Sequence, residues 1–345
     1  MNLAFDLNTI WFFLVGLLFA GYAMLDGFDL GVGALHLFTR GDENRRILLN
    51  AIAPIWDGNE VWLVTAGGAT FAAFPVVYAS MFSYLYSALL IILFALIMRG
   101  VAFEFRGKLD GEAWRRGWDW AIFLGSLIPA LLFGVAFGNI FQGLPMDRAG
   151  YHGSLIGLLN PYGLLTGLLF VTLFIVHGAL WTAMKTLGAL SARAATLAKN
   201  SWVGLLLVAV LFLVNTAFQT NLYRNFLANP IWLVVPAVAV LSLAAIRIYL
   251  LKNNYLHSFF ASCLAILTVT FTGIIGLYPN LIPSSLDPAY SLTIFNASSS
   301  VYTLKIMTVV ALLFVPVVIA YQIWVYRVFR GKLVVEEVTK DPEAY

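Results

Sequence analysis

Four carboxylic acids in two neighbouring apolar segments are the residues of this chain best suited to chemistry. Segment 53–62 reads APIWDGNEVW and contains Asp57 and Glu60, and segment 25–33 reads LDGFDLGVG and contains Asp26 and Asp29. The members of each pair are three residues apart, so on a helix they share one face. Such groups accept and release protons, or bind cations.

The composition places these acids in a membrane. Of 345 residues, 61% are hydrophobic and only 11% are charged, whereas a soluble domain has about 25% charged residues. The net charge of +3 gives no indication of nucleic-acid binding, and the single Cys263 excludes a disulfide framework or a thiolate metal cluster within the chain. No basic segment precedes the first apolar run, which we therefore expect to be a permanent span rather than a cleaved signal peptide.

A membrane-spanning helix needs about 20 mostly apolar residues, and nine stretches qualify. They are residues 11–35, 51–77, 79–98, 121–141, 162–184, 202–218, 231–250, 259–278 and 306–326. With the amino terminus outside, 17 of the 20 Lys and Arg residues lie in inner loops or the tail, and only Arg148, Arg224 and Lys305 lie outside. This bias is typical of membrane proteins. We predict one all-α domain, 1–345, with nine spans and a short cytoplasmic tail, 331–345.

All four acids should lie at a similar depth in the cytoplasmic half. At about 1.5 Å per residue, Asp29 and Asp57 are both about 10–15 Å from the inner loop that joins the first two spans. An ionised carboxylate at mid-membrane costs about 2.5–3.5 kcal/mol on insertion scales. Neither segment has a Lys or Arg at this depth, so the compensating charge must be a proton, a bound cation or a group from elsewhere. Arg99 is the nearest cationic candidate, and Glu104 could form a mouth on the cytoplasmic side. The acids are either structural hydrogen-bond acceptors or parts of a proton path.

Other candidates are weaker. Among the four histidines only His177 falls inside a span at depth, with no second histidine opposite it, so we expect a hydrogen-bonded core residue rather than a haem or metal ligand. The outer-loop serines have no triad partners, which argues against a hydrolase. Small residues four apart would let helices approach closely or could arise by chance; they are the pairs Gly27/Gly31, Gly134/Gly138 and Gly163/Gly167.

These motifs resemble subunit II of the cytochrome bd quinol oxidase family over nearly the whole chain. The most specific segments are residues 26–33 and 53–62, because long polar motifs inside spans are difficult to match by accident. Further similar segments are the Arg45-Arg46 pair, 65–68 (TAGG), 118–120 (WDW), 134–139 (GVAFGN), 160–164 (NPYGL) and the Tyr278-Pro279 to Ser285 loop.

The resemblance implies a subunit with two four-helix bundles and a peripheral helix, paired with a subunit I that carries two haems b, one haem d and the quinol site. The complex would oxidise quinol, reduce oxygen to water with protons from the cytoplasm, and lie in the prokaryotic inner membrane. Small single-helix accessory subunits are possible partners. No haem is expected on this chain, although some family members hold a structural quinone or lipid in this subunit.

The resemblance also gives roles to the acids. Asp57 and Glu104 match family positions in a proton path that leads to the oxygen site, and Asp26, Asp29 and Glu60 would support it. Ile55, Glu60 and Glu104 differ from some members, which have His, Gln and Asp there. Two alternatives remain from the residues: a proton- or cation-coupled transporter, against which the absence of inverted repeats argues, and a scaffold whose acids only accept hydrogen bonds.

Overall fold

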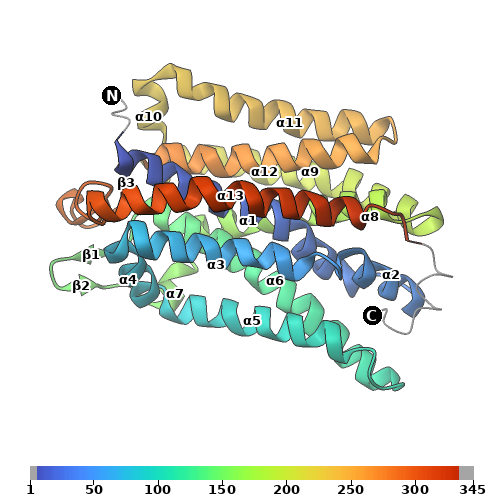
Figure 1. Ribbon diagram of the computed structural model, residues 1–345. Coiled ribbons are helices and arrows are strands. Elements are labelled where there is room, and N and C mark those ends of the chain that lie inside the picture. The colour runs from blue at the N-terminus through green and yellow to red at the C-terminus, as the bar shows by residue number, and fades with distance from the viewer. Residues whose placement is uncertain (1–5, 334–345) are drawn as a thin grey trace.

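The chain folds almost entirely into helices that run along one common direction (Figure 1). The computed structural model describes residues 6–333, so most of the expected tail, residues 334–345, lies outside the described residues. Nine long helices of the described residues make up the bundle. They are α1 (Leu7–His36), α3 (Trp56–Ala73), α5 (Tyr86–Phe105), α6 (Glu112–Gln142), α8 (Pro161–Lys185), α9 (Gly188–Gln219), α11 (Val234–Leu251), α12 (Tyr255–Leu277) and α13 (Val301–Val328).

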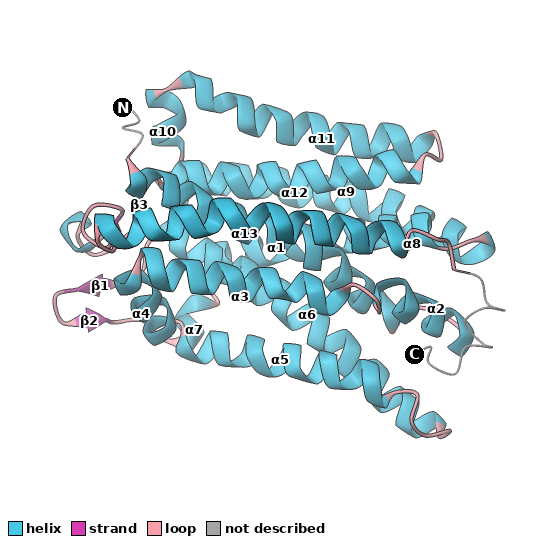
Figure 2. Ribbon diagram, in the orientation of Figure 1, coloured by secondary structure: helices cyan, strands magenta, loops and turns pink. Residues whose placement is uncertain are grey.

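Short elements connect the long helices at both ends of the bundle (Figure 2). The helical ones are α2 (Asp42–Ile52), α4 (Pro75–Tyr84), α7 (Leu155–Leu158), α10 (Tyr223–Ala228) and the 3₁₀ turns η1 (Pro230–Leu233) and η2 (Pro288–Tyr290). Two antiparallel pairs of strands lie at the end opposite α2: β1 (Met146–Asp147) with β2 (Gly150–Tyr151), and β3 (Asn280–Ile282) with β4 (Leu292–Thr293). Leu144 forms a parallel bridge to Ser284 and so joins the two loops.

Eight helical segments of the described chain are long and apolar enough to cross a membrane. They are α1, α5, α6, α8, α9, the segment Pro230–Leu251, α12 and α13. Seven of the nine expected spans correspond to these segments, and most of their ends agree to within several residues. The two larger differences are the start of α9, 14 residues before residue 202, and the start of α6, nine residues before residue 121. The start of α1 is fixed by Asp6, whose side chain accepts a hydrogen bond from the Thr9 N–H.

The expected spans 51–77 and 79–98 differ most from the structure. The chain forms α2, α3, α4 and α5 in this region, because proline lacks an amide hydrogen and cannot continue a helix. Pro54 falls in the turn between α2 and α3, and Pro75 begins α4 after Phe74 leaves helical geometry. Helix α3, in the region of the expected second span, is therefore only 18 residues long and is not among the eight segments, and α5 begins at Tyr86 rather than residue 79.

Helix α1 occupies the centre of the bundle, where it contacts α3, α6, α8, α12 and α13. The other extensive helix contacts pair α8 with α9, α6 with α8, α11 with α12 and α5 with α6. Helix α13 lies across α1 and α3 at the surface (Figure 1), and its most apolar stretch is entirely unburied. The first turn of α1 and the end of α13 are at opposite ends of the molecule.

Glycines allow the central helices to touch backbone to backbone. A Cβ atom on Gly31 would lie 1.9 Å from the Phe174 carbonyl oxygen, and one on Gly134 would lie 2.6 Å from the Gly167 Cα. The other members of the three expected small-residue pairs are equally close to neighbouring helices. All three pairs are thus real helix contacts, between α1 and α8 and between α6 and α8.

We predict that Gly31→Ala destabilises the protein by at least about 1–3 kcal/mol, the usual cost of forcing extra atoms into a packed core. The new methyl group would meet backbone, which cannot rotate away, so α1 and α8 must separate. Thermal unfolding of the purified protein measures the effect. Gly204→Ala on α9 is the matched control, because nothing lies within 4 Å of its Cβ position. Equal melting temperatures for the two variants would contradict the prediction.

Candidate functional site

A buried arginine gathers the acids of the two motifs. Arg99, on α5, is fully buried and places its Nη2 atom 2.7 Å from Asp26 Oδ1 and its Nη1 atom 3.3 Å from Asp26 Oδ2. Glu60 Oε1 on α3 is 3.6 Å from the same Nη1 atom. The compensating charge is therefore supplied by another helix of this chain. A group from elsewhere in the protein was one of the three possibilities that the sequence left open.

Local packing holds the guanidinium at this depth. Gly125 on α6 has no side chain, and a Cβ there would lie 2.8 Å from the Ala95 oxygen and from the Arg99 Cβ. The Arg99 Cζ atom lies 5.9 Å from the Trp56 ring centre and 5.7 Å from that of Phe103, within the range of cation–π attraction. Two aromatic rings and two carboxylates thus surround one cation.

A second carboxyl group, Asp29, is connected to α13 through Asn59. The Asn59 amide donates to Asp29 Oδ2 at 2.7 Å, and the Asn59 oxygen accepts bonds from Gln322 at 3.0 Å and from the Tyr326 hydroxyl at 2.9 Å. Trp62 Nε1 donates to Gln322 Oε1 at 2.7 Å. These bonds form a continuous chain from α1 through α3 to α13.

Three acids face one cation in this cluster, which we call the Arg99 cluster: Asp26, Asp29, Glu60, Arg99 and Asn59. Two buried oxygen atoms, Asp29 Oδ1 and Glu60 Oε1, have no hydrogen-bond partner among the described residues. If all three carboxyl groups were ionised, the cluster would carry a net charge of −2 in an apolar bundle.

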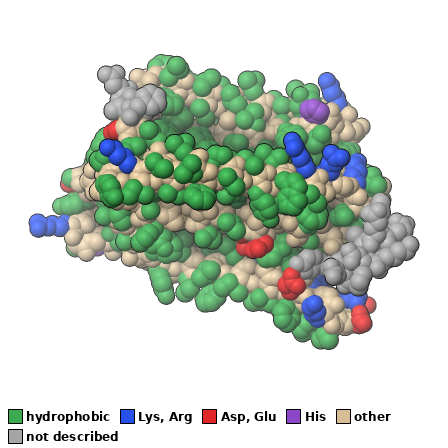
Figure 3. Space-filling model, viewed as in Figure 1, with side chains coloured by type: hydrophobic (Ala, Val, Ile, Leu, Met, Phe, Trp, Pro, Cys, Tyr) green, Lys and Arg blue, Asp and Glu red, His purple; other side chains and the backbone are tan. Residues whose placement is uncertain are grey.

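Asp57 does not join the Arg99 cluster. It belongs to the first turn of α3, and its side chain is exposed on the lateral surface of the bundle, next to the exposed Gly58. Acidic side chains interrupt the hydrophobic face over α3 in Figure 3. The expected group of four acids is therefore two fully buried acids, Asp26 and Asp29, a half-buried Glu60 and an outward-facing Asp57.

Glu104, on α5, is related to Asp57 through one aromatic contact. Trp56 packs edge-to-face against Phe103, with ring centres 5.1 Å apart, so the residues that follow them, Asp57 and Glu104, flank one aromatic contact between α3 and α5. Glu104 is exposed as well. Both carboxyl groups face outward on the same pair of helices.

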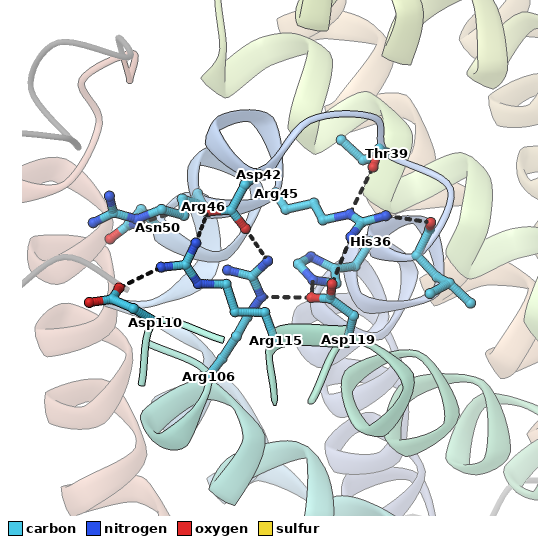
Figure 4. Close-up of polar contacts among 11 residues, drawn as sticks. His36, Thr39, Asp42, Arg45, Arg46, Asn50, Arg106, Asp110, Arg115 and Asp119 are labelled. Carbon is cyan, nitrogen blue, oxygen red and sulfur yellow. Dashed lines mark hydrogen bonds and ion pairs between the residues drawn. The ribbon is translucent and has the colours of Figure 1, made fainter. Parts of the chain in front are cut away.

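An ion-pair network covers one end of the bundle, beside α2 (Figure 4). Asp119, on α6, accepts hydrogen bonds from Arg45 Nη1 at 2.7 Å and Arg106 Nε at 2.6 Å, and its Oδ1 atom lies 2.6 Å from His36 Nε2. Arg106 also binds Asp42 at 2.6 Å. Additional ion pairs join Arg115 to Asp42 and to Asp110. The network ties the end of α1 to α2, α5 and α6.

Sequence reasoning missed Asn59, Gln322 and Tyr326 as members of the site. Asn59 lies inside the APIWDGNEVW motif, between Asp57 and Glu60. Its position between two acids could have indicated that it binds a carboxyl group. Gln322 and Tyr326 are more than 260 residues away from it in the chain, so no spacing rule connects them. The network around Asp119 was missed in the same way, although Arg45 and the WDW segment had been noted.

The histidines have other partners than a haem or a metal. His177 Nδ1 lies 2.6 Å from the Ser262 hydroxyl and its Nε2 lies 2.9 Å from the Met24 carbonyl oxygen, while its ring stacks on Phe259. Both nitrogens are thus engaged. His152, in the loop between β2 and α7, is bonded to Asp147 and holds the pKa of that carboxyl group below its ordinary value. Within residues 6–333 no cluster of three potential metal ligands occurs.

The comparisons with known proteins agree on one family. A family model described as "Cytochrome bd terminal oxidase subunit II" matches residues 7–329. This chain belongs to that family. The chain is 43% identical over 331 residues to "Cytochrome bd ubiquinol oxidase subunit 2" of Bacillus subtilis, covering 95% of this chain and 97% of the relative. It is 37% identical over 368 residues to "Cytochrome bd-I ubiquinol oxidase subunit 2" of Escherichia coli K12, covering 97% of each.

A solved bd oxidase has the same fold. A chain of the bd oxidase from Geobacillus thermodenitrificans superposes with a TM-score of 0.73 at 19% identity, over 94% of this chain and 98% of the other. The family and the apolar helices together make this cytochrome bd oxidase subunit a multi-pass protein of the bacterial inner membrane and part of an oxidoreductase. The family resemblance drawn from the sequence motifs is confirmed.

We predict that Arg99→Leu destabilises the subunit by about 3–5 kcal/mol, because it leaves Asp26 buried without its cation. The measurement is the melting temperature and yield of the purified complex. The double variant Asp26→Leu/Arg99→Leu removes both charges and should recover part of the loss. If the single variant were as stable as the unmodified protein, the ion pair would have no structural importance.

Proposed function

We propose that this chain is the haem-free subunit II of a quinol:oxygen oxidoreductase, and that it packs against a haem-bearing subunit I and helps to deliver cytoplasmic protons to its oxygen-reducing site. The membership of an oxidase family supports this function over the transporter alternative. The observation that carries the proton-transfer part is the outward orientation of Asp57 and Glu104 on α3 and α5.

Exposed carboxyl groups on a membrane-spanning face require a covering partner. On α3 the exposed residues next to Asp57 are apolar or small, among them Val61, Val64 and Gly68. The apolar surface continues along α5, with Phe94 and Met98, and along all of α13. Contact of Asp57 with lipid tails would be costly. A second protein with polar groups at this depth would avoid the cost, and we propose that subunit I binds to this α3–α5–α13 face.

The proton path we propose begins at Glu104, continues to Asp57, and leaves this chain there for subunit I. The Arg99 cluster lies directly behind Asp57, because Trp56, the residue before Asp57, packs over the Arg99 guanidinium. Asp26, Asp29 and Glu60 would support the path by fixing the charge around it and by exchanging protons with it. In this arrangement α3 is a ninth membrane crossing, so the start of α1 and the end of α13 lie on opposite sides of the membrane. The distribution of Lys and Arg residues supports an outer start of α1 and a cytoplasmic end of α13.

The haems expected in the complex do not fit this chain. A ligand histidine needs a free nitrogen that faces a cavity, yet His177 has both nitrogens engaged. The linings of the cavities of about 350 and 110 Å³ contain no histidine, cysteine or methionine. We propose that the two haems b, the haem d and the quinol site all belong to subunit I. The smaller cavity is almost wholly apolar, with Phe137, Phe170 and Phe212 in its lining, and suits the tail of a structural quinone or a lipid.

We predict that Asp57→Asn lowers the oxygen-reduction rate of the assembled complex by about 10²-fold or more, the usual loss when a proton-transferring group is removed. Oxygen consumption driven by a quinol, measured together with the haem spectrum, tests this. Normal spectra with slow turnover indicate a proton-transfer role, and loss of the haem d signal indicates a role in assembly at the interface.

Two variants serve as controls. Asp57→Glu retains a carboxyl group and should recover much of the activity, and Glu112→Gln neutralises an exposed acid at the start of α6 and should leave activity unchanged. Full oxidase activity with normal spectra in Asp57→Asn would contradict the proposal and leave the scaffold alternative, in which the acids only accept hydrogen bonds.

A further inference from the structure

A cavity of about 350 Å³ opens near the end of the bundle where α1 ends and α9 begins. Its wall is formed by the last residues of α1, the loop that follows, α2, the end of α8 and the first turns of α9. On α9 the lining residues are Leu190, Arg193, Ala194 and Leu197, which recur at helical spacing and so form one face. In the proposed orientation this cavity lies at the level of the cytoplasmic lipid headgroups.

The charges in this cavity are of one sign. Arg40, in the loop after α1, and Arg193, on α9, both line it, and no lining residue is acidic. Neither guanidinium has a hydrogen-bond or ion-pair partner among the described residues. The two lining hydroxyl groups, Thr39 and Thr182, already donate to the carbonyl oxygens of Leu35 and Gly178. The two guanidinium groups are therefore the available donors, and both are exposed and able to bind an anion.

The rest of the lining is apolar and continues into the lateral surface of α9. Leu35, Leu48 and Ala194 form the buried wall. Beyond the exposed Leu197 the exposed face of α9 continues with Leu207 and Leu211. An occupant with an anionic head and long apolar chains would match both parts, whereas a free anion would use only the guanidinium groups.

We propose that this cavity binds an anionic phospholipid of the inner leaflet, with its phosphate between Arg40 and Arg193 and its acyl chains along α9. Basic pockets between spans on the cytoplasmic side are typical sites for such headgroups. Helix α9 packs on α8 and α11, whereas the proposed contact with subunit I uses α3, α5 and α13. The lipid site is thus independent of the proposed proton path and remains accessible to lipid in the complex.

The test uses the purified two-subunit complex, delipidated and then titrated with vesicles or nanodiscs of phosphatidylglycerol or of the zwitterionic phosphatidylcholine. Bound lipid is quantified by native mass spectrometry, and the melting temperature is recorded in parallel. Each basic residue near an anionic lipid contributes about 1 kcal/mol, so Arg40→Ala/Arg193→Ala should weaken phosphatidylglycerol binding about 30-fold. Arg116→Ala removes an exposed arginine at the same end of the bundle that does not line the cavity, and it should bind the lipid normally.

Selective stabilisation by phosphatidylglycerol that the double variant loses and Arg116→Ala retains would support the proposal. Equal binding by the double variant and the unmodified complex would overturn it, as would equal protection by phosphatidylcholine. Inorganic phosphate alone distinguishes the remaining source of the anion: if it protects as well as phosphatidylglycerol does, the cavity is a soluble-anion site and the lipid proposal is wrong.

Discussion

Burial of one guanidinium among apolar helices determines how the centre of this subunit is built. Arg99 cannot lose its proton, so its charge must be balanced within the bundle, and the only way to do so is to bring carboxyl groups from other helices to it. Asp26 supplies the close pair from α1 and Glu60 supplies a longer contact from α3. Removing either side alone would leave an isolated charge. The positions of α1, α3 and α5 relative to one another are therefore coupled by electrostatics as well as by packing.

The surplus of acid over base in the Arg99 cluster distinguishes it from a purely structural ion pair. A single Asp–Arg pair would be electrically complete, and the two further carboxyl groups add negative charge that nothing else in the described cluster neutralises. Asn59 stabilises only one of these carboxyl groups. Its amide donates a hydrogen bond to Asp29, and its oxygen accepts hydrogen bonds from Gln322 and Tyr326 of α13. Such an arrangement is costly for stability, and this cost is compatible with the supporting role in proton transfer that we propose for the cluster.

The sequence predicted the membrane class, seven of nine spans and the family, because each depends on local composition or on unbroken motifs. It placed Arg99 near the acids because depth along a helix is a matter of counting residues. The sequence did not predict which way the Asp57 side chain of α3 faces. Pro54 ends α2 and the helix restarts at Trp56, so the direction in which Asp57 points depends on the geometry of this break rather than on its distance from Glu60. Partners such as Tyr326 could not be predicted from the sequence, because only tertiary packing brings α13 beside α3.

The outward position of Asp57 also explains why depth alone was an incomplete guide to its function. Asp26 and Asp29 are buried and contact other helices of this chain. Asp57 and Glu104 lie exposed on α3 and α5, and the most apolar stretch of the peripheral helix α13 contains no buried residue. A carboxyl group in that position gains its final environment only when another protein covers it. In the proposed complex, groups of both chains would surround Asp57, which suits the role that we propose for it in passing protons from one subunit to the other.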